Sequence, residues 1–208
     1  MVRSRVSCFK RRLGFVLIAP LFFLGMYQTY VFGGKAPVEK TGQITSYSVT
    51  GGEDGDLQKG IKWPNPRFTD KGNGTVKDNL TNLIWLKDAN AFGLRTWEQA
   101  LSDANTLSSG SHGLTDGSKV GDWRLPNVKE LHSLIDFAYH NPALSSSSGK
   151  SQWTDGDAFT GVKSDSYWSS TTHSSYSTFA WAVNHFAGSV LTLNKTFTCP
   201  VWPVRSGQ

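Results

Sequence analysis

Two capping boxes near the middle of the chain constrain its fold more than any other feature. Thr96 is followed three residues later by Gln99, and Asn127 is followed by Glu130. In a capping box the first side chain accepts a hydrogen bond from the first helical turn, and the second side chain reaches back to the cap residue. The sequence therefore predicts helices that begin after Thr96 and after Asn127.

Apolar residues recur at helical spacing behind both boxes. They are Trp97, Ala100, Leu101, Ala104 and Leu107 in the first helix, and Val128, Leu131, Leu134, Ile135 and Ala138 in the second. Each predicted helix has one apolar and one polar face, which is typical of a helix packed against a sheet. We interpret both stripes as core.

Short strands are predicted on either side of the helices. They comprise residues 68–70, 75–77, 83–86, 167–170, 179–186, 189–193 and 201–204. The first two flank an Asn-Gly turn, which favours a hairpin, and residues 141 to about 165 form a long Ser- and Gly-rich loop region. This order predicts an α+β fold, with two helices packed on antiparallel β-sheet and long loops.

Alternation within 179–186 places Phe179, Trp181, Val183 and His185 on one face of a strand. Aromatic residues in apolar strands are expected in the core. This group comprises Trp85, Trp168, Trp181 and Trp202. Trp123 and Leu125 are expected there too, with Arg124 or Arg205 bonding to loop carbonyls at its edge.

The first 34 residues have the pattern of an export signal. Five cations precede an apolar run from Leu13 to about Gly25, as in a secretory signal peptide. Continued to Phe32, the run reaches roughly 20 residues and could instead anchor the chain in a membrane. We therefore expect a signal peptide or anchor over 1–34, a linker over 35–66 and one domain over 67–208, located in the periplasm, on the cell surface or outside the cell.

The basic charge of the chain belongs to this leader. Lys and Arg number 21 against 16 acidic residues, and the leader holds five of the 21, which leaves 16 of each sign. A neutral domain gives no support for nucleic-acid binding. Membrane contact is expected only through the N-terminal segment, if it stays uncleaved.

Several blocks of the chain resemble the Lcl C-terminal domain family, a bacterial family named from a collagen-like adhesin. They are GNGTVKDNLTNLIWLKDAN (72–90), TWEQALSDANTL (96–107), GDWRLPNVKELHSLIDF (121–137), YWSSTT (167–172) and VWPVRSGQ (201–208). The resemblance extends over about residues 42–208. It implies a C-type-lectin-like fold, an exported location and adhesion or ligand binding; the namesake domain is associated with sulfated polysaccharides. Members with cysteines where this chain has Ala91 and His112 could form a bridge that is absent here.

Enzymatic readings lack their residues. The formylglycine-generating enzymes share the broad fold but need paired cysteines, and beyond the leader only Cys199 exists, which we interpret as buried. No histidine pair has zinc-site spacing. We therefore expect no catalytic residues, no metal and no cofactor, although Asp54-Gly55-Asp56 and Asp155-Gly156-Asp157 leave open a calcium site built from separated loops.

The best candidate for a binding surface is the aromatic and hydroxyl-rich segment near the C-terminus. Its candidate ligand-binding residues are His173, Ser174, Ser175, Tyr176, Thr178, Phe179, His185, Phe186 and Phe197. Flat aromatic side chains beside small hydroxyls are typical of binding loops on rigid scaffolds. The expected partner is an extracellular protein or polysaccharide, and Trp153 could add a face for stacking on a sugar.

Two further hypotheses concern the same segment. Its irregular positions between His173 and Thr198 are types reached when Asn codons are randomised at their adenines, as in targets of diversity-generating retroelements; the alternative is an ordinary Ser- and Thr-rich β surface. For the whole domain, the alternatives to a binding module are an enzyme on a formylglycine-generating-enzyme-like fold and a purely structural part of a surface assembly.

Overall fold

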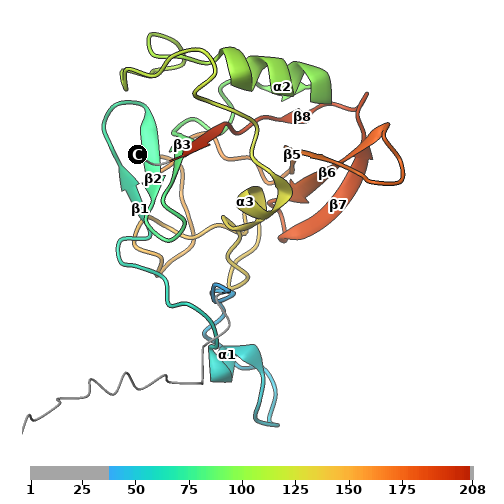
Figure 1. The fold of residues 1–208 in the computed structure, drawn as a ribbon. Coiled ribbons are helices and arrows are strands. Elements are labelled where there is room, and N and C mark those ends of the chain that lie inside the picture. Colours follow the sequence, from blue (N-terminus) through green and yellow to red (C-terminus); the bar gives the residue numbers. More distant parts are fainter. Residues whose placement is uncertain (1–37, 207–208) are drawn as a thin grey trace, which may run out of the picture. The chain divides into compact units, whose positions relative to one another are not determined.

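The computed structural model describes residues 38–206, so the predicted leader lies outside the described residues. Within this range the chain is a mixed α/β domain with antiparallel sheets and few helices (Figure 1). The described residues form helices α1 (Asp54–Leu57), α2 (Trp97–Thr106) and α3 (Val128–His132). None of these helices is long and apolar enough to cross a membrane.

Both predicted helices begin where their capping boxes place them. The side chain of Gln99 accepts a hydrogen bond from the backbone N–H of Thr96 at 3.0 Å, and Asn127 Oδ1 accepts from the N–H of Glu130 at 3.0 Å. However, α3 ends at His132, and the expected stripe residue Ala138 is exposed. The helix stops because tight turns follow it, in which the Ser133 hydroxyl donates to the carbonyl of Glu130 at 2.7 Å.

A four-stranded sheet joins the two ends of the domain. Its strands are β1 (Phe68–Asp70), β2 (Thr75–Asp78), β3 (Leu83–Leu86) and β9 (Val204–Ser206), in the order β1-β2-β3-β9. The predicted hairpin and the strand at 83–86 are confirmed. Gly74 is required in the turn because its φ is +82° and an added Cβ would collide with the carbonyl of Gly113.

The strand predicted at 201–204 is wrong in its bounds. The segment is divided between β8 (Cys199–Pro200), which pairs with β4 (Leu94–Arg95), and β9, while 201–203 leave the strands. Pro203 has no N–H to donate to a ladder, and its carbonyl accepts instead from the N–H of Leu86 at 3.1 Å. The neighbouring Trp202 Nε1 donates to the carbonyl of Leu86 at 2.9 Å, which buries the indole.

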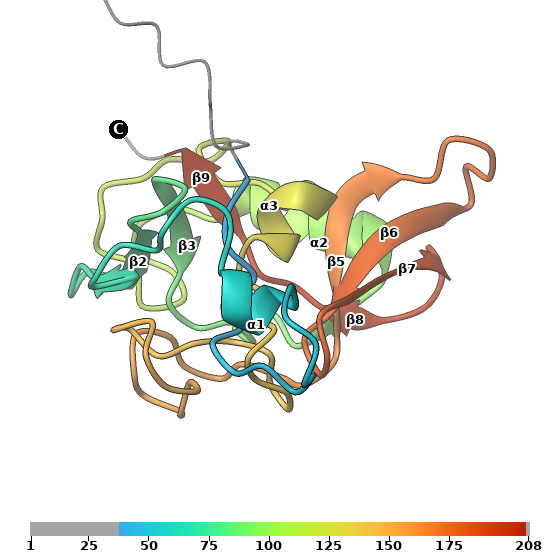
Figure 2. The ribbon, with the colours of Figure 1, turned by 90° about the horizontal axis from the view of Figure 1, so that it is seen from below.

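The third sheet is a meander of β5 (Ser166–Thr172), β6 (Phe179–Asn184) and β7 (Ser189–Asn194), which lie side by side in Figure 2. β6 is shorter than predicted because the chain turns after Asn184. Neighbouring residues of β5 point to opposite faces: Trp168 packs in a cluster with α2, and Tyr167 packs in the main core with Leu131 of α3. The sheet is thus covered on both faces near the start of β5.

The core is built around tryptophans. Trp85, Trp123, Trp168 and Trp202 are fully buried, as predicted, and Leu125 is buried with them. Trp181 does not follow this prediction, because its indole is partly exposed. The arginine prediction also needs correction: Arg124 and Arg205 pair with the carboxylates of Glu130 and Asp116.

A buried ion pair lies beside this core. The guanidinium of Arg67 donates to both carboxylate oxygens of Asp78, at 2.9 and 3.1 Å, and to the carbonyl of Ser133 at 2.8 Å. Both side chains are inaccessible to solvent. Trp63 covers the guanidinium at 4.4 Å, so the segment before the domain is anchored to it.

Residues 38–66 contain α1 and a bridge between Glu39 and Ile61, and the rest is irregular. The N–H of Phe137 donates to the carbonyl of Thr41 at 2.8 Å. This segment therefore packs on the domain at more points than the expected contact through Trp63.

Candidate binding surface

A row of aromatic side chains runs over the β5–β6 hairpin. The ring of His173 stacks on Trp181, with centroids 5.5 Å apart and planes inclined by 24°. Tyr176 follows at 5.2 Å from His173, and Phe179 lies 6.4 Å from Tyr176. Tyr176 is 64% exposed, and the other three rings are partly exposed. Four of these aromatic groups thus form one accessible surface, the hairpin row: His173, Tyr176, Phe179 and Trp181.

The loop that carries the hairpin row is held by its own backbone. His173 Nδ1 accepts hydrogen bonds from the N–H groups of Ser175 and Tyr176, both at 3.2 Å. The N–H of His173 donates to the carbonyl of Phe179 at 3.0 Å, and the N–H of Phe179 donates to that of Tyr176 at 2.9 Å. In Figure 1 this loop projects from the end of the sheet. A loop closed in this way loses little further entropy when a ligand binds.

The remaining candidates lie at different places around the same hairpin. Ser174, Ser175 and Thr178 are exposed on the loop. Phe186 is at the opposite end of β6, 48% exposed and 6.3 Å from the ring of His140, while Phe197 follows β7 and is 58% exposed. The structure therefore groups the loop residues and separates Phe186 from them.

His185 is a correction, because it is completely buried and presents no surface to a ligand. Its ring packs between Tyr167, at 4.9 Å, and Trp202, at 5.6 Å. Strand alternation ends before it: β6 stops at Asn184, whose side-chain carbonyl accepts from the N–H of Phe186 at 2.8 Å and turns the chain. Burial lowers the pKa of His185 to about 4, so the ring is neutral near pH 7.

Trp181 is the residue that the sequence interpretation missed. It was assigned to the core because of its apolar strand, yet Ala180 and Ala182 are the side chains of β6 that pack inward with α2. The signal was present, since Phe179 and Trp181 share the alternating face. What the sequence did not reveal is that this face is left open at one end of the strand.

A family model supplies the comparison that decides the relationship of the chain. The model of the Lcl C-terminal domain matches residues 74–205, which span β2 through β9 and include the whole hairpin. The chain belongs to the Lcl C-terminal domain family. No curated protein matches it.

In this Lcl C-terminal domain the acidic pairs considered for calcium have structural partners. Asp155 accepts from the N–H of Gly161 at 2.8 Å, and Asp157 accepts from that of Ser147 at 2.9 Å. Over residues 38–206 no group of three or more His, Cys, Asp or Glu is placed to hold a metal ion. Trp153 is also engaged, with its indole packed on the core and Nε1 donating to Phe159 at 3.2 Å, which corrects its expected role in sugar stacking.

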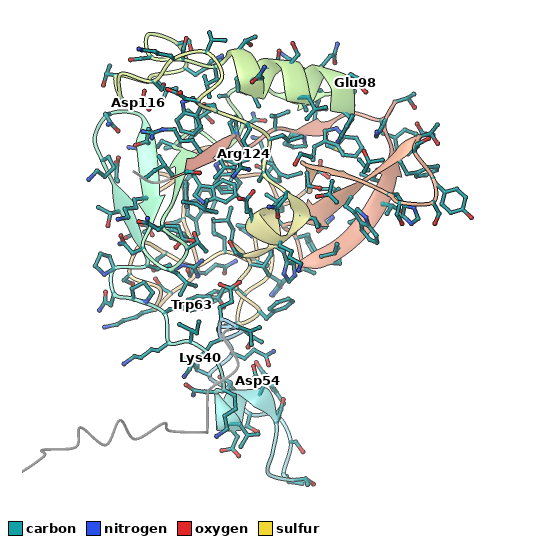
Figure 3. The ribbon with its side chains drawn as sticks, viewed as in Figure 1. Lys40, Asp54, Trp63, Glu98, Asp116 and Arg124 are labelled. Carbon is teal, nitrogen blue, oxygen red and sulfur yellow. The ribbon has the colours of Figure 1, made fainter. Side chains whose placement is uncertain are left out.

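Two other features bear on the chemistry of the Lcl C-terminal domain. Cys199 is buried as predicted, and burial raises the pKa of its thiol to about 12, so it carries no thiolate at neutral pH. A cleft of about 320 Å³ lies between the N-terminal segment and the loop at Gly149. Its lining includes Lys40, Lys62 and Trp63, two of which are labelled in Figure 3, and neither an acid nor a histidine.

Proposed function

We propose that this Lcl C-terminal domain is an exported, non-enzymatic binding module with a C-type-lectin-like fold. It recognises an extracellular protein or glycan through the hairpin row and the hydroxyls beside it. The observation that carries the proposal is the exposure of Tyr176 over the stacked pair His173 and Trp181, on a loop held by its own hydrogen bonds.

Physical chemistry favours recognition at this surface. Exposed aromatic groups that form a contiguous patch mark interaction sites in soluble proteins. Tyr and Trp supply large contact areas with few rotatable bonds, and Ser174, Ser175 and Thr178 add hydroxyls that adapt to a polar ligand. The cleft beside Trp63 offers no acid and base for catalysis, which supports binding in preference to turnover.

The test is a comparison of variants against a glycan array and a displayed peptide library. Tyr176→Ser and Trp181→Ala should each weaken the strongest signal of the parent chain at least tenfold, because central aromatic contacts contribute about 2 kcal/mol or more to binding. The control is Val120→Ala, which removes a comparably exposed apolar group outside the hairpin. Unchanged binding by the folded Tyr176 and Trp181 variants would refute the proposal.

Diversification of the same surface is a second part of the proposal. If the segment is randomised by a retroelement, gene copies from related strains should differ at exposed loop positions such as Ser174, Tyr176 and Thr178. His185 should stay constant, because any larger or charged group there would disrupt the core. Copies that vary no more here than elsewhere would favour an ordinary β surface.

Export can be tested independently of the ligand. A reporter enzyme that is active only outside the cytoplasm, fused after Gln208 of the full chain, should be active, and the signal should disappear when residues 1–34 are deleted. Activity without residues 1–34 would contradict the predicted role of the leader.

A further inference from the structure

β7 is an edge strand that lacks the usual protection. Within residues 38–206, β6 is the one strand hydrogen-bonded to it, and the register between them is continuous over six pairs. Its sequence, SVLTLN, contains no charge and no proline. Natural edge strands are normally short, charged, bulged or covered, because open backbone groups recruit another strand.

The register identifies the backbone groups that face outward. The N–H of Lys195 donates to the carbonyl of Thr178 at 2.9 Å, so this pair is hydrogen-bonded, and bonded pairs alternate along an antiparallel ladder. Leu193 and Leu191 therefore bond to β6, opposite Ala180 and Ala182. Val190 and Thr192 turn their N–H and C=O groups away from β6, toward the open edge.

The other edge of the same sheet is protected. β5 has a register shift between Trp168 and Thr172, and the N–H of its Ser170 donates to the carbonyl of Pro126 at 2.8 Å. In the four-stranded sheet, β1 is three residues long and ends in Asp70, which pairs with Lys87. The contrast singles out β7 as the strand left free to pair.

We propose that β7 pairs antiparallel with β7 of a second copy of this chain, joining two three-stranded sheets into one. The matching register sets Val190 opposite Thr192 of the partner subunit, so that outward N–H and C=O groups meet. Leu191 then faces the partner subunit's Leu191 across the two-fold axis. This inference goes beyond the proposed recognition surface and does not depend on it.

Self-complementarity favours a second copy as the occupant. The arrangement places β-branched Val190 and Thr192 across from each other, a favourable cross-strand pair, and no like charges meet because β7 has none. Phe186 precedes β7 and Phe197 follows it, both about half exposed. Antiparallel pairing brings the Phe197 end of one copy to the Phe186 end of the other, so each end of the shared ladder gains apolar contact.

Cysteine cross-linking in the full-length chain tests this arrangement. Leu191→Cys is introduced with Cys8→Ser, and Cys199 is kept because it is buried. Cells that produce two differently tagged versions are treated with a membrane-permeant oxidant and analysed by non-reducing electrophoresis. We expect a disulfide-linked dimer of twice the chain mass that carries both tags, because directly opposite residues without mutual backbone bonds have Cβ atoms about 4.5–5.5 Å apart.

Three controls make the result specific. Thr178→Cys, exposed on the same hairpin away from the edge, should give no dimer. Adding Thr192→Pro to Leu191→Cys removes an outward N–H and should abolish the dimer, whereas Thr192→Val keeps the N–H and the dimer. If Thr192→Pro unfolds the chain, the comparison of Leu191→Cys with Thr178→Cys decides. A folded Leu191→Cys chain that stays monomeric, cross-links no better than Thr178→Cys, or joins a different protein would overturn the proposal.

Discussion

The imidazole of His173 stacks on the indole of Trp181 while its Nδ1 accepts two backbone hydrogen bonds from the loop beyond it. One side chain therefore connects the open face of β6 to the conformation of the β5–β6 loop. The relationship explains why the loop and the sheet form one surface, and it leads to the first prediction.

Replacing His173 with Ala should loosen the loop without unfolding the domain. The N–H groups of Ser175 and Tyr176 lose their acceptor, so their hydrogen exchange should accelerate, while global stability falls by only about 1 kcal/mol. His173→Asn keeps an acceptor of the kind found in Asx turns and should exchange more slowly than His173→Ala. Equal exchange in all three chains would contradict the assigned role.

The buried pair of Arg67 and Asp78 should be a large single contributor to stability. Arg67→Met leaves the Asp78 carboxylate buried without its partner, at a cost of about 3–5 kcal/mol in the free energy of unfolding. Urea titration measures this loss. Lys87→Met, which breaks the partly exposed pair of Lys87 with Asp70, should change the same free energy by less than about 1 kcal/mol.

His185 should destabilise the fold on acidification. Its pKa is lowered to about 4 from an ordinary value of 6.5, so the unfolded chain takes up a proton at a higher pH than the folded chain does. The contribution is complete above pH 6.5 and is lost as pH falls toward 4, by up to about 1.4 kcal/mol per unit. His185→Phe, which keeps an aromatic ring between Tyr167 and Trp202, should lack this slope in urea titrations at several pH values. Parallel curves for the two chains would count against it.

Asp136 should act in the opposite direction. Burial raises the pKa of its carboxyl from 3.8 to about 6, against the lowering effect of a hydrogen bond from the N–H of Ala138, and Gly42 packs directly on the carboxyl group. The folded chain therefore binds a proton more tightly, and its stability gains up to about 1.4 kcal/mol per unit as pH falls from 6 toward 4.

This gain offsets the loss from His185 in the parent chain. Asp136→Asn removes it, so the variant should lose stability more steeply between pH 6 and pH 4 than the parent. A variant whose stability follows the parent over that range would show that Asp136 is ionised in the folded protein.

Local sequence determined the parts of this protein that local physics specifies. The capping boxes at Thr96 and Asn127 fixed two helix starts, Asn73-Gly74 fixed a hairpin, and the blocks between 72 and 208 identified the family. Each of these signals depends on residues within a few positions of one another. They were therefore readable before any tertiary structure was known.

Tertiary structure alone decided which side of each strand is covered. His185 and Trp181 were placed on one alternating face, yet the turn after Asn184 buries the first against Trp202, and the end of the sheet leaves the second open. The partner of Arg67 was likewise set by a strand pairing that brings Asp78 beside it. Burial depends on segments distant in the chain, and periodicity within one strand carries no information about what packs over it.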